Sequence, residues 1–489
     1  MLIFLLYKLI INTFIEGLKN VNYYNFKGAK MTFRIEKDSM GEIKVASDKY
    51  WGAQTQRSLL NFNIGNEVFP REFIKAYGII KYVAAQVNNN NNLVSDDIKN
   101  VIQEVSNEVI EGKYDDQFPL VVWQTGSGTQ TNMNFNEVIA NIANEKLGNK
   151  LGVDSTVHPN DHVNRSQSTN DTFPTAINIA SAIQINNNLL PALDNMLEKL
   201  NLKCDEFNDI VKIGRTHLQD ATPLTLGQEF SGYSKQIENS IISIKNTFKF
   251  LLYLPMGGTA VGTGLNAPNN FDLDCAEEIA KITSLPFKTS PNKFESLGCH
   301  DSVVEVSGSL KGLAISLNKI ANDIRWLGSG PRAGIGEIIL PSNEPGSSIM
   351  PGKVNPTQCE AVTMVCSQVI GNDATLTFAG ASGNFELNVY RPVMAYNILQ
   401  SIRLLSDVVN SFTNNCIIDI KANEKKIKNN VNKSLMLVTA LTPHIGYDKA
   451  AKAAKKAHEE NSTLKSAILS LGYLKSDEYD EYVDPKKMI

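Results

Sequence analysis

The feature that most constrains the fold is an unbroken repeat of apolar residues between positions 303 and 327. An apolar side chain recurs every three or four residues, at Val303, Val306, Leu310, Leu313, Leu317, Ile320, Ile324 and Leu327. Two shorter repeats of this kind comprise Tyr233, Ile237, Ile241, Ile244, Phe248 and Leu251, and Leu190, Leu193, Leu197 and Leu200. This period predicts long helices that pack against other long helices at a shallow angle. The chain is therefore predicted to be mainly α, with a central bundle of long helices.

The length of the first predicted helix also bears on assembly. A helix over the 25 residues 303–327 is about 37 Å long at a rise of 1.5 Å per residue. A compact domain usually needs less, so we expect the apolar stripes to continue across an interface between chains. A monomeric, elongated bundle is the alternative.

Domain boundaries follow from the ends of the bundle. Strand-like alternation is scarce, no internal repeat is visible, and segments 160–170 and 414–430 mark the flanks of the helical region. We predict an N-terminal domain at 34–167, a central helical bundle at 168–424 and a small helical domain at 425–489. Residues 1–33 are predicted to be an N-terminal extension or leader.

Composition narrows the class of partner. The 489 residues are 42% hydrophobic and 20% charged, with a net charge of −4 and no basic stripe. These values describe a soluble protein with no feature that attracts nucleic acid, so the expected ligand is small. The six cysteines include no CxxC pair, which argues against a disulfide framework, a zinc ribbon or an iron–sulfur cluster. No metal and no cofactor is expected.

The N-terminus is apolar but poorly suited to a membrane. Residues 1–15 are rich in Leu, Ile and Phe, interrupted by Lys8 and Asn12. The run is too short for a stable membrane span, and it lacks a small-residue cleavage site. A mitochondrial leader is a further possibility, although the absence of Arg and the presence of Glu16 argue against it. Cytoplasm and mitochondrial matrix both stay open, as does a start at Met31.

A run of five asparagines occupies positions 88–92. Such low-complexity runs are most simply solvated insertions. We expect this one in a loop or at a helix end.

The segment 346–356 carries the densest set of chemical groups. It combines the hydroxyls of Ser347 and Ser348, the ammonium of Lys353 and the amide of Asn355. Its prolines fix φ and its glycines permit turns that other residues avoid, so the loop can hold these groups in one geometry. It is predicted to be an anion site, with an ordinary surface loop as the alternative.

Other segments offer uncharged donors. The Gly-Ser-Gly-Thr turn at 126–129 lets backbone N–H groups approach an anion, although such turns are commonly only turns. Residues 168–170 are predicted to begin a helix, with Asp171 as a possible N-cap. In 214–225, His217 follows Thr216 and places a group that titrates near neutrality among uncharged donors, as acid–base catalysis requires.

These segments, with 158–164 and 257–266, occur in one order that resembles the class II fumarases of the fumarase/aspartase superfamily. The resemblance runs from about Phe33 to the C-terminus. It implies a three-domain, mainly α fold and a homotetramer whose core combines the bundles of four chains. It also implies a cofactor-independent hydro-lyase that hydrates fumarate to L-malate in the tricarboxylic acid cycle. Each active site would draw on three chains and bind a small dicarboxylate.

The same resemblance implies individual roles. His217 is expected to be a general acid/base whose imidazole is oriented by Glu360, and Ser347 a catalytic base. A free hydroxyl is a weak base, so loop N–H groups and Lys353 are expected to stabilise its alkoxide. The residues expected to bind substrate are Ser127, Gly128, Thr129, Ser168, Thr169, Asn170, Thr216, Ser348, Lys353, Val354 and Asn355.

A second, non-catalytic dicarboxylate site is implied at His158, Pro159, Asn160 and Asp161. The spacing of His158 and His162 does not fit the HExxH metal pattern, because Pro159 follows the first histidine. A simple turn before the bundle is the alternative.

Two other functions stay open for such a chain. Aspartate ammonia-lyases share the fold, but His217 and Gly352 both favour a fumarase, whereas Thr169 slightly weakens that interpretation. A non-catalytic structural homologue is the other alternative. The retention of His217, Ser347, Lys353, Asn355 and Glu360 argues against it.

Overall fold

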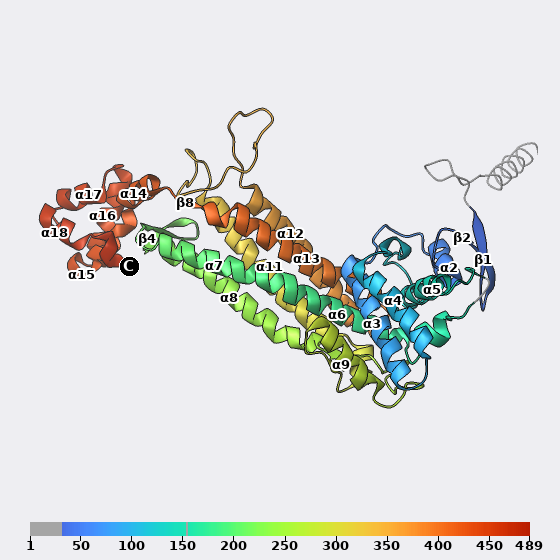
Figure 1. Cartoon of the computed structure of the whole chain (residues 1–489). Helices are drawn as coiled ribbons and strands as arrows, with labels where there is room; N and C mark the ends of the chain where they lie inside the picture. The colour runs from blue at the N-terminus through green and yellow to red at the C-terminus, as the bar shows by residue number, and fades with distance from the viewer. Residues whose placement is uncertain (1–31, 153–154) are drawn as a thin grey trace, which may run out of the picture. The chain divides into compact units, whose positions relative to one another are not determined.

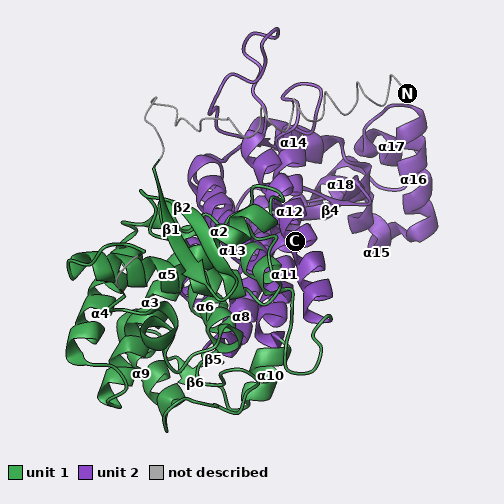
Figure 2. Cartoon of the chain, turned by 90° about the vertical axis from the view of Figure 1, so that its right-hand side faces the viewer, with its two compact units in different colours: residues 1–180, 253–299, 382–396 green, residues 181–252, 300–381, 397–489 purple. Residues whose placement is uncertain are grey.

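The structure is a computed structural model that describes residues 32–152 and 155–489 (Figure 1). The expectations for residues 1–15, for Met31 and for most of the extension at 1–33 concern positions outside the described residues. The described chain forms two compact units (Figure 2), and each is described by itself. Unit 1 comprises residues up to 180, 253–299 and 382–396, and unit 2 comprises 181–252, 300–381 and 397–489. The three predicted domains stay a prediction.

Unit 1 packs helices around a cluster of aromatic rings. Its described elements are β1 (Phe33–Asp38), β2 (Gly41–Ala46), α2 (Ala53–Asn61), α3 (Arg71–Asn90), α4 (Asp96–Glu111), α5 (Thr129–Lys146), most of α6 (Thr169–Gln184), β5 (Tyr253–Leu254), α9 (Phe271–Thr283), β6 (Lys288–Thr289) and α10 (Lys293–Gly298). Tyr77 on α3 stacks on Phe135 of α5, with ring centroids 4.5 Å apart. Phe73 lies 5.0 Å from Phe173 of α6. These contacts fix the starts of α5 and α6, where candidate site residues lie.

Unit 2 contains the predicted long helices. They are α7 (Leu190–Glu206), α8 (Leu226–Leu251), α11 (Asp301–Leu327), α12 (Thr357–Gly380) and most of α13 (Arg391–Asn415). All eight apolar residues of the first predicted repeat are buried on α11. That helix packs against α8 and α12, and α7 packs against α8. The mainly α bundle is therefore confirmed.

Strands are few and short in the described part of the chain. They form four two-stranded sheets, including β3 (Val211–Thr216) with β4 (Gln219–Thr225) and β7 (Ile338–Ile339) with β8 (Lys421–Ala422). The first of these pairs is a hairpin in which Thr216 lies opposite Gln219. This short hairpin is relevant to the candidate site because its turn contains His217.

The C-terminal residues have a hydrophobic cluster of their own. They form α14 (Glu424–Lys433), α15 (Thr442–Ile445), α16 (Tyr447–Glu459), α17 (Leu464–Ser470) and α18 (Ser476–Tyr482). The cluster consists of Leu437, Val438, Leu441, Ala450, Ala453, Leu464, Ile468 and Tyr479. No helix of the described residues is both long and apolar enough to cross a bilayer.

The asparagine run corrects one expectation. It lies at the C-terminal end of α3, as one of the predicted placements has it, but Asn88 is completely buried rather than solvated. Its side-chain amide donates to the carbonyl oxygen of Arg165 at 2.9 Å, and its oxygen accepts the hydroxyl of Ser166 at 2.6 Å. One member of the run is therefore part of the core of unit 1.

Candidate active site

In unit 2, His217 occupies the tip of the β3–β4 hairpin. The two-residue turn consists of His217 and Leu218, with φ values of 55° and 60°. Two positive φ values are typical of a type I′ turn, which Asn-Gly usually supplies. Holding two non-glycine residues there costs on the order of 1–3 kcal/mol each. The imidazole is exposed, so the strained turn presents it to the outside of the unit.

A buried ion network fixes the base of this hairpin. Arg215, two residues before His217, donates to both carboxylate oxygens of Glu337, at 2.9 and 2.6 Å. Lys212, whose side chain is fully buried, lies 3.3 Å from the same carboxylate, and Asn430 of α14 donates to it at 2.9 Å. Burial raises the pKa of Glu337, but the hydrogen bond from Arg215 and the charge of Lys212 outweigh it, so that pKa is lowered. The hairpin is thus anchored by charges that stay ionised.

The loop at 346–356 holds Ser347 in a well-defined geometry. The hydroxyl oxygen of Ser347 accepts the backbone N–H groups of Ile349 and Met350, at 3.2 and 3.0 Å. Two N–H groups directed at one oxygen favour its anionic form. This arrangement supplies the backbone N–H groups that are expected around Ser347.

Gly346 and Asn355 close this loop. The N–H of Gly346 donates to the carbonyl oxygen of Lys353 at 2.8 Å, and the side chain of Asn355 donates to the carbonyl oxygen of Gly346 at 2.6 Å. A Cβ on Gly346 would lie 2.5 Å from the Lys353 oxygen, so no other residue fits. Lys353, Val354 and Ser348 are exposed, and no carboxylate of the described residues pairs with Lys353.

Glu360 lies in the first turn of α12 and is exposed. A carboxylate is favourable there because the helix N-terminus carries a partial positive charge. Within the described residues of a single chain, no hydrogen bond or ion pair joins Glu360 to His217. Their pairing therefore stays a prediction, and it concerns the assembled protein.

In unit 1, the Gly-Ser-Gly-Thr turn immediately precedes α5. The hydroxyls of Ser127 and Thr129 lie 2.8 Å apart, and Gly128 has a φ of 82°. A Cβ on Gly128 would lie 2.1 Å from the ring of Phe173, and one on Gly126 would lie 1.6 Å from a backbone oxygen. Both glycines are thus required by packing, and Gly128 also by its left-handed backbone.

The start of α6 gathers the second set of donors. The hydroxyl of Ser168 accepts the N–H of Asn170 at 3.2 Å, while the carboxylate of Asp171 accepts the N–H of Ser168 at 3.0 Å. Since α6 begins at Thr169, Ser168 occupies the N-cap position, and the expectation that Asp171 is the N-cap is wrong. The other oxygen of Asp171 accepts the N–H groups of Gly257 and Thr259, at 2.9 and 3.0 Å. Asp171 therefore ties the glycine-rich loop 257–266 to the helix.

The structure joins the two sets of unit 1 residues through one amide. Asn132 of α5 donates to the hydroxyl oxygen of Thr169 at 3.0 Å. Asn170 donates to the carbonyl oxygen of Ala260 at 2.7 Å. The first turn of α5 and the residues 168–170 thus belong to one polar network, and Thr169 is only 7% exposed.

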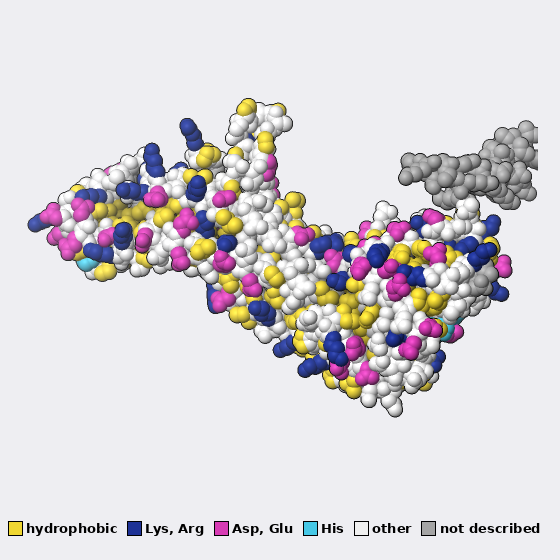
Figure 3. Space-filling view, viewed as in Figure 1, with side chains coloured by type: hydrophobic (Ala, Val, Ile, Leu, Met, Phe, Trp, Pro, Cys, Tyr) yellow, Lys and Arg dark blue, Asp and Glu magenta, His cyan; other side chains and the backbone are white. Residues whose placement is uncertain are grey.

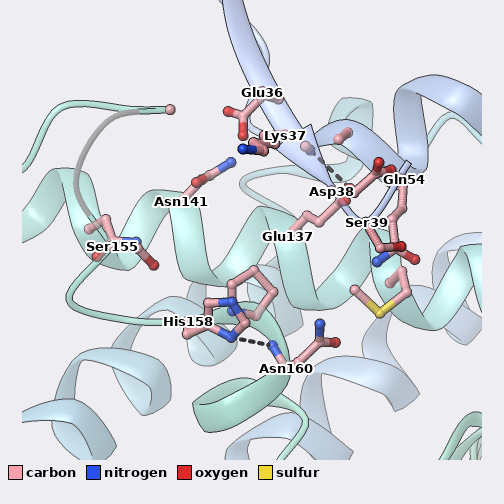
Figure 4. A pocket seen from close by; sticks show the side chains of 16 residues that line it. Glu36, Lys37, Asp38, Ser39, Gln54, Glu137, Asn141, Ser155, His158 and Asn160 are labelled. Atoms are coloured by element: carbon pink, nitrogen blue, oxygen red, sulfur yellow. Dashed lines mark hydrogen bonds between the residues drawn. The ribbon is translucent and has the colours of Figure 1, made fainter. Parts of the chain in front are cut away.

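The segment proposed as a second site forms a tight turn. The Nδ1 atom of His158 accepts the N–H groups of Asn160 and Asp161, at 3.2 and 3.1 Å, at the start of the π-helical turn η2 (Pro159–Val163). The turn borders a pocket of about 480 Å³, shown in Figure 4. Other lining groups come from the end of β1, the start of α2 and the face of α5: Glu36, Lys37, Asp38, Gln54, Glu137 and Asn141.

The acidic groups of this pocket are already compensated. Asp38 receives two hydrogen bonds from Arg57, at 2.8 and 3.0 Å. The buried carboxylate of Glu137 accepts the backbone N–H groups of Gly52, Gln54 and Thr55. The pocket is therefore polar with little net negative charge, which is compatible with a small anion beside His158.

Comparison with known proteins identifies the family to which this chain belongs. A family model described as Lyase matches residues 41–371, and one described as Fumarase C C-terminus matches residues 437–489. The mitochondrial fumarate hydratase of Dictyostelium discoideum is 62% identical over 461 residues, which cover 94% of this chain and 95% of that protein. The chain belongs to the class II fumarases.

A solved structure agrees with this assignment. The class II fumarase from Schistosoma mansoni matches with a TM-score of 0.91 and 43% identity, covering 94% of this chain and 99% of that one. The mitochondrial fumarate hydratase of Rhizopus oryzae is 59% identical over 483 residues, or 97% of this chain and 98% of that protein. The resemblance to class II fumarases is thereby confirmed, together with the mainly α fumarase fold.

Two buried residues that hold the candidate site residues in place were missed from the sequence. Lys81 and Glu337 are both buried and each makes several polar contacts, yet neither lies in a recognisable motif. Lys81 does carry a signal, since it follows Ile79 and Ile80 in an otherwise apolar stretch of α3. A charge inside such a stretch indicates either a helix face turned to solvent or a paired buried group.

Proposed function

We propose that the chain catalyses the reversible hydration of fumarate to L-malate. The observation that carries the proposal is the pair of N–H groups directed at the Ser347 oxygen, because such donors stabilise an alkoxide. Relatives 56–62% identical over most of the chain are named fumarate hydratase, which supports it. His217 and Gly352 favour this reaction over ammonia release from aspartate.

In the dehydration direction, Ser347 takes a proton from the methylene carbon of malate. The electron pair moves into the neighbouring carboxylate, whose charge is stabilised by Lys353 and by the amides of Asn355 and Asn170. The C–OH bond then breaks while His217 donates a proton to the departing hydroxyl, and water leaves. Preorganised donors of this kind are each worth about 3–4 kcal/mol in the transition state.

We further propose a homotetramer in which one active site combines residues of three chains. Bundle helices expose apolar side chains in the single chain, including Ile242 of α8, Ile315 of α11 and Met364 and Ile370 of α12. Figure 3 shows hydrophobic side chains at several places on one face of the chain. Met364 alone is 68% exposed. Burying such side chains between copies of the bundle is favourable by about 25 cal/mol per Å². The exposure of His217, Lys353 and Glu360 in one chain also fits a site that neighbours complete.

Absorbance assays with fumarate and L-malate, and separately with L-aspartate, test the reaction. Turnover of malate with no ammonia from aspartate is expected. Ammonia from aspartate without malate turnover would establish the alternative lyase, and no turnover of either would establish a non-catalytic homologue.

Light scattering and dilution test the assembly. Met364→Lys places a charge on the proposed interface and should yield monomers without activity. Exchanging Lys455, which is exposed on α16 outside the bundle helices, for Met is a control that should leave the assembly intact. Full activity in a monomer excludes the shared site.

The second site and the compartment are proposals of the same kind. We propose that a dicarboxylate binds at 158–161. Calorimetry with malate tests this by comparing Ser347→Ala, which stops turnover, with the double variant Ser347→Ala/His158→Ala, which should bind fewer malate molecules per chain. We propose the mitochondrial matrix or the cytoplasm as the location, since the relatives from Dictyostelium and Rhizopus are named mitochondrial. N-terminal sequencing of the protein from its source, with cell fractionation, decides between them.

A further inference from the structure

Lys81, on the core-facing side of α3, is 1% exposed. Its ammonium donates to three side-chain oxygens: Asn132 at 2.8 Å, Gln167 at 2.9 Å and Asn164 at 3.3 Å. All three partners are neutral amides, so its three donors are satisfied without an ion pair. Burying a cation whose only partners are neutral amides costs more free energy than burying an apolar side chain of similar size.

The three partners come from segments that bear on the site. Asn132 lies in the first turn of α5, just after the Gly-Ser-Gly-Thr turn, and Gln167 immediately precedes Ser168. Asn164 follows the turn η2 and accepts a second hydrogen bond from Asn132, at 3.0 Å. One ammonium thus joins the start of α5 to the segment leading into α6.

A second contact from the same face of α3 holds that segment. Asn88 lies seven residues, or two helical turns, beyond Lys81. It bonds to both Arg165 and Ser166. Ser166 has a φ of 63°, a strained value for a serine that persists only when surrounding contacts impose it. Segment 164–167 is therefore clamped by α3 at two points.

The groups that depend on this clamp include Ser168, Thr169 and Asn170. Asn132 accepts a hydrogen bond from the Lys81 ammonium and donates one to the Thr169 hydroxyl, so a shift of Lys81 would also move Thr169. From the opposite side, Asp171 fixes the start of α6 to the loop 257–266. Burial lowers the pKa of Lys81 to about 7, and the charge of Asp171 opposes that shift.

We propose that Lys81 is a positioning residue, whose ammonium sets segment 164–167 against α5 so that 168–170 meet the substrate. The inference rests on the proposed function, because it takes residues 168–170 to bind the dicarboxylate. A displacement of about 1 Å at such groups can reduce kcat/KM by about 100-fold.

The test compares Lys81→Met, which keeps the length of the side chain and removes its donors, with Lys75→Met on the exposed face of α3. After the wild-type protein is shown to hydrate fumarate, KM and kcat are measured for folded tetramers of both variants. We expect Lys81→Met to raise KM for fumarate at least 10-fold while kcat falls less than 3-fold, and Lys75→Met to change neither. Lys81→Gln, which retains a donor, should recover part of the loss.

A KM within twofold of wild type in folded Lys81→Met overturns the inference, as does a lower thermal midpoint without a change in KM. If Lys81→Met does not fold, Gln167→Leu decides, because it removes one partner and leaves the lysine in place. A raised KM in that variant supports the inference, and an unchanged KM overturns it. A wild-type protein that does not hydrate fumarate contradicts the proposed function instead.

Discussion

The candidate residues of the two units are held in different ways. In unit 2, backbone geometry presents His217 and Ser347, through positive φ values in one case and two N–H groups in the other. In unit 1, buried side chains hold residues 168–170, chiefly through Asn132, Lys81 and Asp171. Substitutions in the first set should therefore change the chemical step, and substitutions behind the second set should change substrate binding.

The largest effect is expected at the serine loop. Ser347→Ala should lower kcat about 1,000-fold, because it removes the proposed base while the loop keeps its N–H groups. Steady-state kinetics of folded tetramers measure this. Ser342→Ala, at an exposed position just before the loop 346–356, is the matched control and should retain full activity. A kcat within 10-fold of wild type in Ser347→Ala removes Ser347 from the catalytic set.

The second-largest effect is expected at Glu337, which holds the β3–β4 hairpin through Arg215 and Lys212. Glu337→Gln leaves Arg215 and Lys212 without their shared carboxylate and should lower the free energy of unfolding by about 3 kcal/mol at pH 7. The folded-state pKa of Glu337 is lowered, so its contribution is present above the unfolded pKa of about 4 and is lost as pH falls through the folded value. Urea unfolding at pH 7 and at about pH 3, below the unfolded pKa, measures the loss of stability and its dependence on pH.

The control is Glu344→Gln, at an exposed position. It should match wild type at both pH values. A deficit for Glu337→Gln that stays the same at both pH values contradicts the assigned ionisation of Glu337.

At His217, on the tip of the hairpin, a substitution should lower activity without lowering stability. His217→Asn should lower kcat about 100-fold, because the proposed acid is lost. Asn tolerates positive φ better than other residues, so the fold should keep or slightly gain stability. Kinetics and thermal unfolding of one preparation measure the two effects. A strong loss of stability would show that the imidazole also supports the hairpin.

The smallest effect concerns pH dependence in unit 1. The pKa of Lys81 is about 7 in the folded chain and about 10.4 when unfolded, so the unfolded state binds more protons between these values. Wild-type stability should therefore rise relative to Lys81→Met by about 2 kcal/mol from pH 7 to pH 9. Unfolding curves at both pH values measure this difference. Parallel behaviour of the two proteins would contradict the burial of a titrating ammonium.

The sequence predicts those parts of the molecule whose signal is local. All eight positions of the repeat are buried on α11, and the 3.5-residue period indicates them without knowledge of the partner helix. The hairpin that carries His217 gives no such signal, since His-Leu lacks the Asn-Gly composition of its turn type. Lys81, Asn88 and Glu337 acquire their roles only from distant partners. A single sequence does not reveal these partners.

The burial of Asn88 constrains how the length of the asparagine run can change in evolution. A homopolymeric tract is prone to replication slippage, and its length would ordinarily be unconstrained on a protein surface. Here the first asparagine is locked into the core while Asn90 and Asn92 face outward. The tract therefore has one end bound in the core, while its other end forms the exposed turn into α4, where the side chain of Asn89 donates to the carbonyl oxygen of Val94 at 2.9 Å. Lengthening is tolerable only beyond the anchored amide, a bias that tract lengths in related genes would display.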